Sequence, residues 1–278
     1  MHGTLTKCHI LLAAALAVLT LASCRKAPEG PSLSQYSERS EATQNANFEN
    51  YVIELRALPL EEALARQEAV MQEAEADTAA WQRITRLQEH FLLDPNSPYR
   101  SEELYIPVVN HLLSSDKASG QQRLRAEWIA PRIVLNRIGT PAADFHFQLR
   151  NGRPATLYGT IDAASPDLTL LFFSNPGCPN CKEITDALSK DLKVQMLISE
   201  GKLLVVNIYP DEDIQAWLDY LPEYPSEWVC GRDPDGVLNS STLYWLRAIP
   251  SLYLLDREKR VILKDATLED VLLNCKQR

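Results

Sequence analysis

The sequence predicts a small all-α domain over residues 48–137, followed by an α/β domain over residues 138–278. In the first stretch, apolar residues recur at helical spacing without strand-like alternation. In the second, short apolar runs alternate with helical patterns, which is typical of a sheet flanked by helices. A third observation points to chemistry: the apolar run Leu168–Phe173 is followed by Cys178-Pro-Asn-Cys181 and then by a helical pattern.

Residues 1–23 have the features of a signal peptide. Lys7 supplies a positive charge, and Ile10 to Leu21 forms an apolar segment that is too short to span a bilayer. The segment ends in Leu-Ala-Ser-Cys24, which resembles the lipobox of bacterial lipoproteins. That resemblance implies that Cys24 is acylated and becomes the first residue of the mature chain. The alternative is an ordinary signal peptide with a chance cysteine.

Residues 24–47 are rich in Ser, Glu, Pro, Gln and Asn, and this composition predicts a flexible tether. Acyl chains on Cys24 would hold the protein at a membrane without a transmembrane helix. We therefore expect a lipid-anchored protein of the cell envelope. Arg25 follows the cysteine, in place of the Asp linked to inner-membrane retention of bacterial lipoproteins, which favours the outer membrane and its periplasmic face.

The charge balance narrows the class of partner. The 278 residues carry a formal net charge of −9, and no basic cluster offsets it. Such a surface argues against a nucleic-acid partner or an anionic membrane surface as ligand.

The first domain is predicted to contain four or five helices. Asp77-Thr78 and Ser101 are candidate N-caps, Pro95 to Pro98 form a break, and Gly120 separates the last helix. The apolar positions at near-helical spacing are Leu60, Leu64, Met71, Ala74, Trp81, Ile84, Leu87 and Phe91. His90 and His111 lack a second histidine at metal-ligand spacing, so we expect no metal site there. This domain would position substrate or drive self-association into a homo-oligomer.

The second domain begins with a predicted hairpin around Asn151-Gly152, whose return strand covers Ala155 to Tyr158. Continuous apolar runs at Leu168–Phe173 and 202–209 predict central strands buried on both faces. Helices are expected over 182–192, over a short segment that ends near Glu200 before Gly201, from a cap at Asp211 or Asp213 to Tyr220, and over 239–247. The segments 251–255 and 260–263 predict a closing hairpin, and Thr267 begins the last helix.

The Cys-Pro-Asn-Cys segment has the spacing of a dithiol redox site. Pro179 suits the first position of a helix, so Cys178 would lie at the helix N-terminus, where unpaired N–H groups favour a thiolate. We assign Cys178 as the nucleophile and Cys181 as the thiol that resolves the mixed disulfide. Asn180 completes the loop between them. A structural disulfide or fortuitous spacing is the alternative.

In this context, residues 138–278 resemble the thioredoxin fold, a mixed central sheet flanked by helices. Ile249-Pro250 before Ser-Leu-Tyr-Leu-Leu-Asp256 is similar to the family's cis-proline segment, which implies a cis Pro250 and a substrate-binding role for both residues. Ala143 to Phe147, ahead of the Asn-Gly turn, resembles the opening of peroxiredoxin-type and periplasmic TlpA-like members. The whole architecture is similar to envelope lipoproteins with an uncharacterised helical domain before a thioredoxin-like domain.

The sequence also departs from this family at the site. Gly177 stands where a tryptophan usually precedes the first cysteine, and Phe172 stands where many thioredoxins bury an acid. Glu183 is the nearby acid that could substitute, although a surface role suits it better. These departures put the direction of electron flow in doubt.

Two further cysteines, Cys230 and Cys275, lie outside the motif. We expect both to be buried as small hydrophobic residues, with a mutual disulfide as the alternative. No cofactor is expected beyond the Cys178–Cys181 disulfide.

The resulting hypothesis is a membrane-anchored thiol–disulfide oxidoreductase of the bacterial envelope, a reductase or isomerase that acts on protein thiols and disulfides. One alternative is a thiol peroxidase, but Asn175 occupies the place of the Thr or Ser that usually lies three residues before a peroxidatic cysteine. The other is a non-catalytic binding or assembly lipoprotein in which the thioredoxin-like domain is scaffold.

Overall fold

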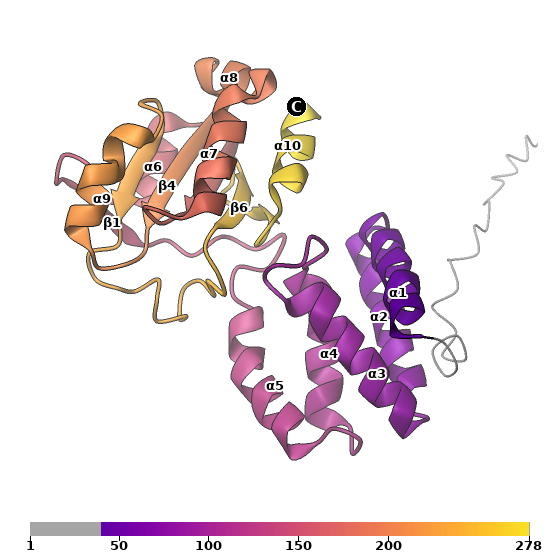
Figure 1. The fold of residues 1–278 in the computed structure, drawn as a ribbon. Helices are drawn as coiled ribbons and strands as arrows, with labels where there is room; N and C mark the ends of the chain where they lie inside the picture. The colour runs from indigo at the N-terminus through magenta and orange to yellow at the C-terminus, as the bar shows by residue number, and fades with distance from the viewer. Residues whose placement is uncertain (1–39, 278) are drawn as a thin grey trace, which may run out of the picture.

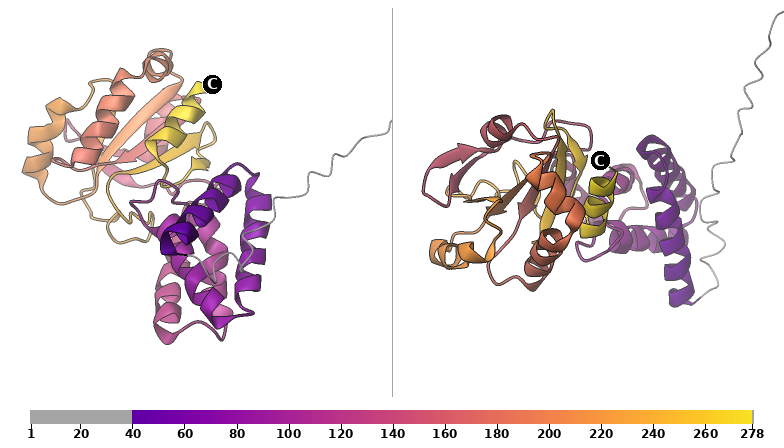
Figure 2. Two further views of the ribbon diagram at one scale, coloured as in Figure 1. Left: turned by 45° about the vertical axis from the view of Figure 1, so that its right-hand side comes forward. Right: turned by 90° about the horizontal axis from the view of Figure 1, so that it is seen from above.

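The structure is a computed structural model in which residues 40–277 are described. The predicted signal peptide, the acylation site Cys24 and residues 24–39 of the predicted tether lie outside the described residues. An α-helical region and a sheet region lie side by side (Figures 1 and 2). None of the helices in the described part is long and apolar enough to cross a membrane. The predicted fold class, an all-α region followed by an α/β region, is confirmed.

The described part of the helical region contains five α-helices and a π-helical turn. Polar side chains begin most of these helices: Ser40, Asp77, Ser101 and Ser119 each accept a hydrogen bond from a backbone N–H of the first turn. The helices are α1 (Glu41–Arg56), α2 (Leu60–Ala74), α3 (Thr78–Gln88), the π-turn (Glu89–Leu93), α4 (Glu102–Ser114) and α5 (Gly120–Ile133).

Helix α1 begins earlier than the sequence pattern predicts, because residues 41–47, which we assigned to the tether, are helical. Its buried apolar stripe starts only at Phe48, so the first two turns lack the periodic signal that identifies a helix. The Ser40 hydroxyl, which accepts from the Thr43 N–H at 3.4 Å, caps this polar extension.

The sheet region contains seven strands in the order β2-β1-β5-β4-β3-β6-β7. The central strands β3, β4 and β5 are parallel, and the remaining pairs are antiparallel. The strands are β1 (His146–Leu149), β2 (Pro154–Thr156), β3 (Leu168–Phe173), β4 (Leu203–Tyr209), β5 (Val229–Arg232), β6 (Ser251–Asp256) and β7 (Val261–Leu263).

Two apolar cores lie on opposite faces of this sheet. Helices α7 (Pro179–Lys190), α8 (Leu192–Ser199) and α10 (Leu268–Lys276) pack on the face that carries Leu170, Phe172 and Val205. Helix α6 (Leu157–Ala164) packs on the other face, together with Leu238 and Tyr244 from an irregular segment. Helix α9 (Ile214–Tyr220) follows β4 and begins with Asp213 as its cap.

Two expectations for this region are wrong. The predicted return strand of the first hairpin ends at Thr156, whose hydroxyl accepts from the Gly159 N–H and starts the unpredicted helix α6. Residues 239–247, predicted as a helix, are irregular. Tyr244 is buried in the sheet core and its neighbour Trp245 in the helical core, and adjacent residues of one helix do not point into two different cores.

Candidate active site: the dithiol loop and the cis-proline loop

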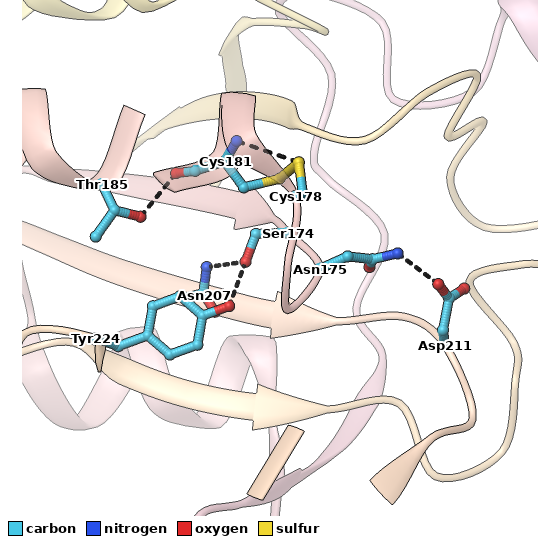
Figure 3. The surroundings of a disulfide bond; sticks show 8 residues. All are labelled: Ser174, Asn175, Cys178, Cys181, Thr185, Asn207, Asp211 and Tyr224. Atoms are coloured by element: carbon cyan, nitrogen blue, oxygen red, sulfur yellow. Dashed lines mark hydrogen bonds between the residues drawn. A yellow bond between two sulfur atoms is a disulfide. The ribbon is translucent and has the colours of Figure 1, made fainter. Parts of the chain in front are cut away.

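The two motif cysteines lie where the sequence predicts, between strand β3 and helix α7. Cys178 is the N-cap of α7, and Pro179 is its first residue. The cysteines form a disulfide with their Cα atoms 5.2 Å apart (Figure 3). Gly177, immediately before them, has a φ of +72°, a backbone conformation that a side chain would strain. The glycine that replaces the usual tryptophan therefore permits this turn into the helix.

The two cysteine residues differ in exposure. Cys178 is partly exposed, whereas Cys181 is 3% exposed and belongs to the core under α7. The Cys181 backbone N–H donates to Cys178 Sγ at 3.1 Å. This donor and the helix N-terminus would stabilise a thiolate on Cys178 once the disulfide is reduced. The geometry therefore suits Cys178 as the nucleophile and Cys181 as the resolving thiol.

The core beneath the disulfide is apolar where many thioredoxins have an acid. Phe172 is fully buried, and the Trp228 ring packs edge-on against it with centroids 6.3 Å apart. Glu183 is exposed on α7, so it does not replace the missing acid. Lys182 is also exposed, and its ammonium group lies 3.1 Å from Asp186 in an ordinary surface ion pair.

A neutral hydrogen-bond network lies near the disulfide instead (Figure 3). Asn207 Nδ2 donates to Ser174 Oγ at 2.7 Å, and Ser174 Oγ is 2.9 Å from the Tyr224 hydroxyl. Burial raises the pKa of the Tyr224 phenol to about 12, so it remains a neutral donor and acceptor at physiological pH. The sequence pattern does not predict this network. The one sequence feature that points to it is Asn207, a polar residue inside an otherwise apolar strand.

A second polar contact holds the loop before Cys178. Asn175 Nδ2 donates to Asp211 Oδ2 at 2.5 Å, which ties the end of β3 to the loop after β4 (Figure 3). Asn239 Nδ2 donates to the other oxygen of Asp211 at 3.2 Å. The dithiol loop is therefore fastened to two neighbouring segments of the sheet region.

The peptide bond between Ile249 and Pro250 is cis, as the resemblance implies. In the antiparallel register of β3 and β6, Phe173 pairs with Ser251. Pro250 therefore comes directly before β6, at the end of the sheet where β3 finishes and the chain turns towards Cys178. Ile249 packs against the cores on both faces of the sheet, which fixes this loop beside the dithiol.

The other two cysteines are both buried and free, so the expectation of buried small residues is confirmed and the mutual disulfide is not formed. Burial raises the pKa of the Cys230 thiol and of the Cys275 thiol. Neither is therefore a ready nucleophile at neutral pH.

The histidines of the helical region do not gather other metal ligands into a site. His111 lies 2.9 Å from Glu75 and 3.0 Å from Glu68, which joins α4 to α2. Among residues 40–277, no group of three or more His, Cys, Asp or Glu side chains is placed to hold a metal ion.

Comparison with known proteins agrees with this architecture. Residues 32–133 match the family described as "Domain of unknown function (DUF5106)". No curated protein matches the sequence. A thioredoxin-like protein from Bacteroides caccae is 34% identical, with 89% of this chain and 88% of that chain covered and a TM-score of 0.79. The thioredoxin-like fold predicted for the second region is thereby confirmed.

Two further solved structures cover about half of the chain. The C-terminal domain of an uncharacterized protein from Bacteroides fragilis is 40% identical over 51% of this chain and 98% of that chain, with a TM-score of 0.48. The thioredoxin domain of a thiol-disulfide oxidoreductase from Bacteroides vulgatus is 19% identical over 51% of this chain and 96% of that chain, with a TM-score of 0.44.

Proposed function

This chain belongs to the thioredoxin-like family, with a helical region before its thioredoxin fold, and we propose that it is a thiol–disulfide oxidoreductase that works as a reductase or isomerase. The observation that carries the proposal is the placement of the Cys178–Cys181 disulfide at the N-terminus of α7, with the partly exposed Cys178 at the same end of the sheet as the cis-proline. Its substrates would be disulfides of envelope proteins.

In the reducing direction, the Cys178 thiolate attacks one sulfur of a substrate disulfide. The substrate S–S bond breaks, one substrate sulfur leaves as a thiolate that takes up a proton, and a mixed disulfide forms. Cys181 then loses its proton and attacks Cys178 Sγ, which releases the second substrate thiol and closes the Cys178–Cys181 bond. Two electrons pass to the substrate, and a dithiol donor restores the pair. In isomerisation, the substrate's own thiol displaces Cys178 and no net electrons move.

The backbone beside Pro250 offers a place for the substrate chain. Proline has no N–H to donate, and the backbone groups of its neighbours would pair with an extended substrate segment. A segment paired there would bring its disulfide to Cys178, the more exposed of the two cysteines.

The test is catalysed reduction of insulin disulfides by the purified protein with dithiothreitol as donor. We expect turnover by the wild type and none by the Cys178→Ser variant. A Cys275→Ser variant is the matched control, because it removes a buried thiol of the same fold, and it should keep its activity. Equal rates for wild type and Cys178→Ser would contradict the proposal.

A second candidate is a non-catalytic binding or assembly role, which Phe172 favours because no acid lies beneath Cys181 to accept its proton. In that case the Cys178→Ser variant would support growth of the cell as well as the wild type does, whereas loss of the whole protein would not.

We propose that the protein is anchored at the outer membrane by acyl chains on Cys24 and faces the periplasm. The support is the lipobox-like segment that ends at Cys24. A Cys24→Ala variant should fail to incorporate a labelled fatty acid and should leave the membrane fraction. A variant that still incorporates the label would contradict this anchor.

A further inference from the structure

The cis-proline loop is held from the helical region as well as from its own sheet. The loop follows Trp245 and Arg247 and leads into Ser251, the first residue of β6. The side chains of both Trp245 and Arg247 contact residues of the helical region. Trp245 is 5% exposed and belongs to the core of the helical region. Its ring packs edge-on against Trp128 of α5, with centroids 6.0 Å apart.

Arg247 makes the more directional contact. Its Nε donates to Glu102 Oε1 at 2.9 Å, and its Nη2 donates to Asp265 Oδ2 at 2.5 Å. Its Nη1 donates to the backbone carbonyl of Leu93, at the end of the π-turn. The side chains of Arg247, Glu102 and Asp265 are 7%, 0% and 9% exposed. The guanidinium group therefore joins the helical region to the loop between β7 and α10.

Asp265 holds both sides of the cis-proline loop with one carboxylate. Oδ2 accepts from Arg247, and Oδ1 accepts from the Ser251 hydroxyl at 3.1 Å. The residues between these two points are Ala248, Ile249 and Pro250. A shift of the carboxylate would thus move the loop at both ends.

The helical region also contacts the backbone of Asp265 and the two residues beside it. Arg100 Nε donates to the Asp265 carbonyl oxygen at 3.0 Å, and Arg100 Nη2 donates to the Ala266 carbonyl oxygen at 2.8 Å. Lys264 Nζ lies 2.8 Å from Glu102 Oε2 and donates to the Ile133 carbonyl oxygen at 2.7 Å. Buried ion pairs of this kind stabilise a protein little more than apolar residues of similar volume would. Their charge-assisted hydrogen bonds, however, require a specific geometry of the paired groups.

We propose that Glu102, Arg247 and Asp265 are positioning residues through which the helical region sets the cis-proline loop against the Cys178–Cys181 pair. The inference rests on the proposed function and assigns a role to the helical region. It also implies that only the reduction of polypeptide disulfides depends on the helical region, because only a substrate with an extended chain uses the loop. A small disulfide needs access to Cys178 Sγ alone.

The experiment compares Arg247→Met with Arg56→Met. Arg56 forms the matched contact between the same two regions, because its Nη2 lies 2.7 and 2.8 Å from the two oxygens of Asp270, and it does not touch the loop. For each protein, kcat/KM is measured with insulin as the polypeptide disulfide and with 5,5′-dithiobis(2-nitrobenzoate) as the small one. Ser251→Ala is the milder variant, because it removes only the hydrogen bond from Ser251 to Asp265 and leaves the ion pairs in place. If Arg247→Met does not fold, the rates of Ser251→Ala test the positioning role instead.

We expect Arg247→Met to lower kcat/KM for insulin by about tenfold to a hundredfold, since a misplacement of about 1 Å far from the chemistry can cost that much. The rate with the small disulfide should stay within about twofold of wild type, and Arg56→Met should change neither rate. Arg247→Lys, which keeps the charge, should restore part of the insulin activity. An equal fall for both substrates, or no fall for insulin, would overturn the proposal.

Hydrogen exchange separates this inference from the proposed function. The backbone amides of Ala248, Ile249 and Ser251 should exchange faster in Arg247→Met and Ser251→Ala than in wild type and Arg56→Met. If the wild type reduces neither disulfide, the proposed function fails, and exchange alone then decides whether the loop is held in this way. Unchanged exchange in Arg247→Met would contradict the positioning role.

Discussion

Arg247 and Glu102 are 145 residues apart in the chain and form a hydrogen-bonded ion pair with 2.9 Å between Nε and Oε1. Both side chains are buried between the two regions of the molecule. This pair connects a domain of unknown role to the segment that carries the cis-proline. The helical region is therefore in direct contact with the segment that leads into the cis-proline.

Removal of Lys264 should destabilise the protein strongly. Its side chain is 1% exposed, and its ammonium group lies 2.8 Å from Glu102 Oε2 and donates to the Ile133 carbonyl oxygen, so Lys264→Met leaves both buried oxygen atoms without this cationic donor. We expect a loss of about 3–5 kcal/mol in the free energy of unfolding, measured by guanidinium denaturation.

The control for this prediction is Lys202→Met. Lys202 lies at the same 2.8 Å from Glu200, but both side chains are exposed. Its removal should cost at most about 1 kcal/mol. Similar losses for the two variants would show that burial of the ion cluster does not carry the stability that we assign to it.

The Cys181→Ser variant should accumulate mixed disulfides. Without the buried resolving thiol, the bond between Cys178 and a substrate sulfur persists. Non-reducing electrophoresis of the envelope fraction should show new high-mass bands that reductant removes. The double variant with Cys178→Ser should show none, and bands that persist in it would point to Cys230 or Cys275 instead.

Tyr224 should contribute a measurable alkaline limit to stability. Burial raises the pKa of its phenol to about 12, above the unfolded value of about 10. A raised folded-state pKa means that the contribution is complete below about pH 10 and is lost as the pH rises towards about 12.

The comparison is with Tyr224→Phe, which also loses the contact with the Ser174 hydroxyl and should be less stable by about 1 kcal/mol at neutral pH. Its stability should fall less steeply than that of the wild type over the alkaline range. Other buried tyrosines titrate in both proteins, so the difference isolates Tyr224. Parallel curves for the two proteins would contradict this assignment.

Alkylation should distinguish the cysteines. In the reduced native protein, iodoacetamide at mildly alkaline pH should modify Cys178 first, because it is partly exposed and lies at a helix N-terminus. Cys230 and Cys275 should react only after unfolding, because burial raises the pKa of both thiols. Peptide mass mapping before and after addition of guanidinium chloride measures both expectations, and early modification of Cys230 would contradict them.

Features that depend on residues adjacent in the chain could be predicted from the sequence. The apolar strand Leu168–Phe173, the two cysteines and Pro179 specify a strand, a turn and a helix start, and the structure has all three in place. The cis bond at Pro250 was also predicted, although by resemblance and not from local physics.

The wrong helix over 239–247 and the missed buried polar groups have their cause in long-range packing. Residues 239–247 have local helical character, but Tyr244 and Trp245 are drawn into cores on different sides of the chain. Glu, Arg and Asp are residue types that usually lie at the surface. Only the tertiary fold brings Glu102, Arg247 and Asp265 together away from solvent. The buried network of Ser174, Asn207 and Tyr224 joins three separate segments and has no sequence spacing that would identify it.

The most direct test of the redox assignment is a titration of the purified protein in glutathione buffers, with free thiols trapped and mapped at Cys178 and Cys181. We expect a reversible two-electron transition between roughly −120 and −270 mV, the range of working oxidoreductases. A potential below about −300 mV, or cysteines that never react, would make the bond a structural one and contradict the proposed activity.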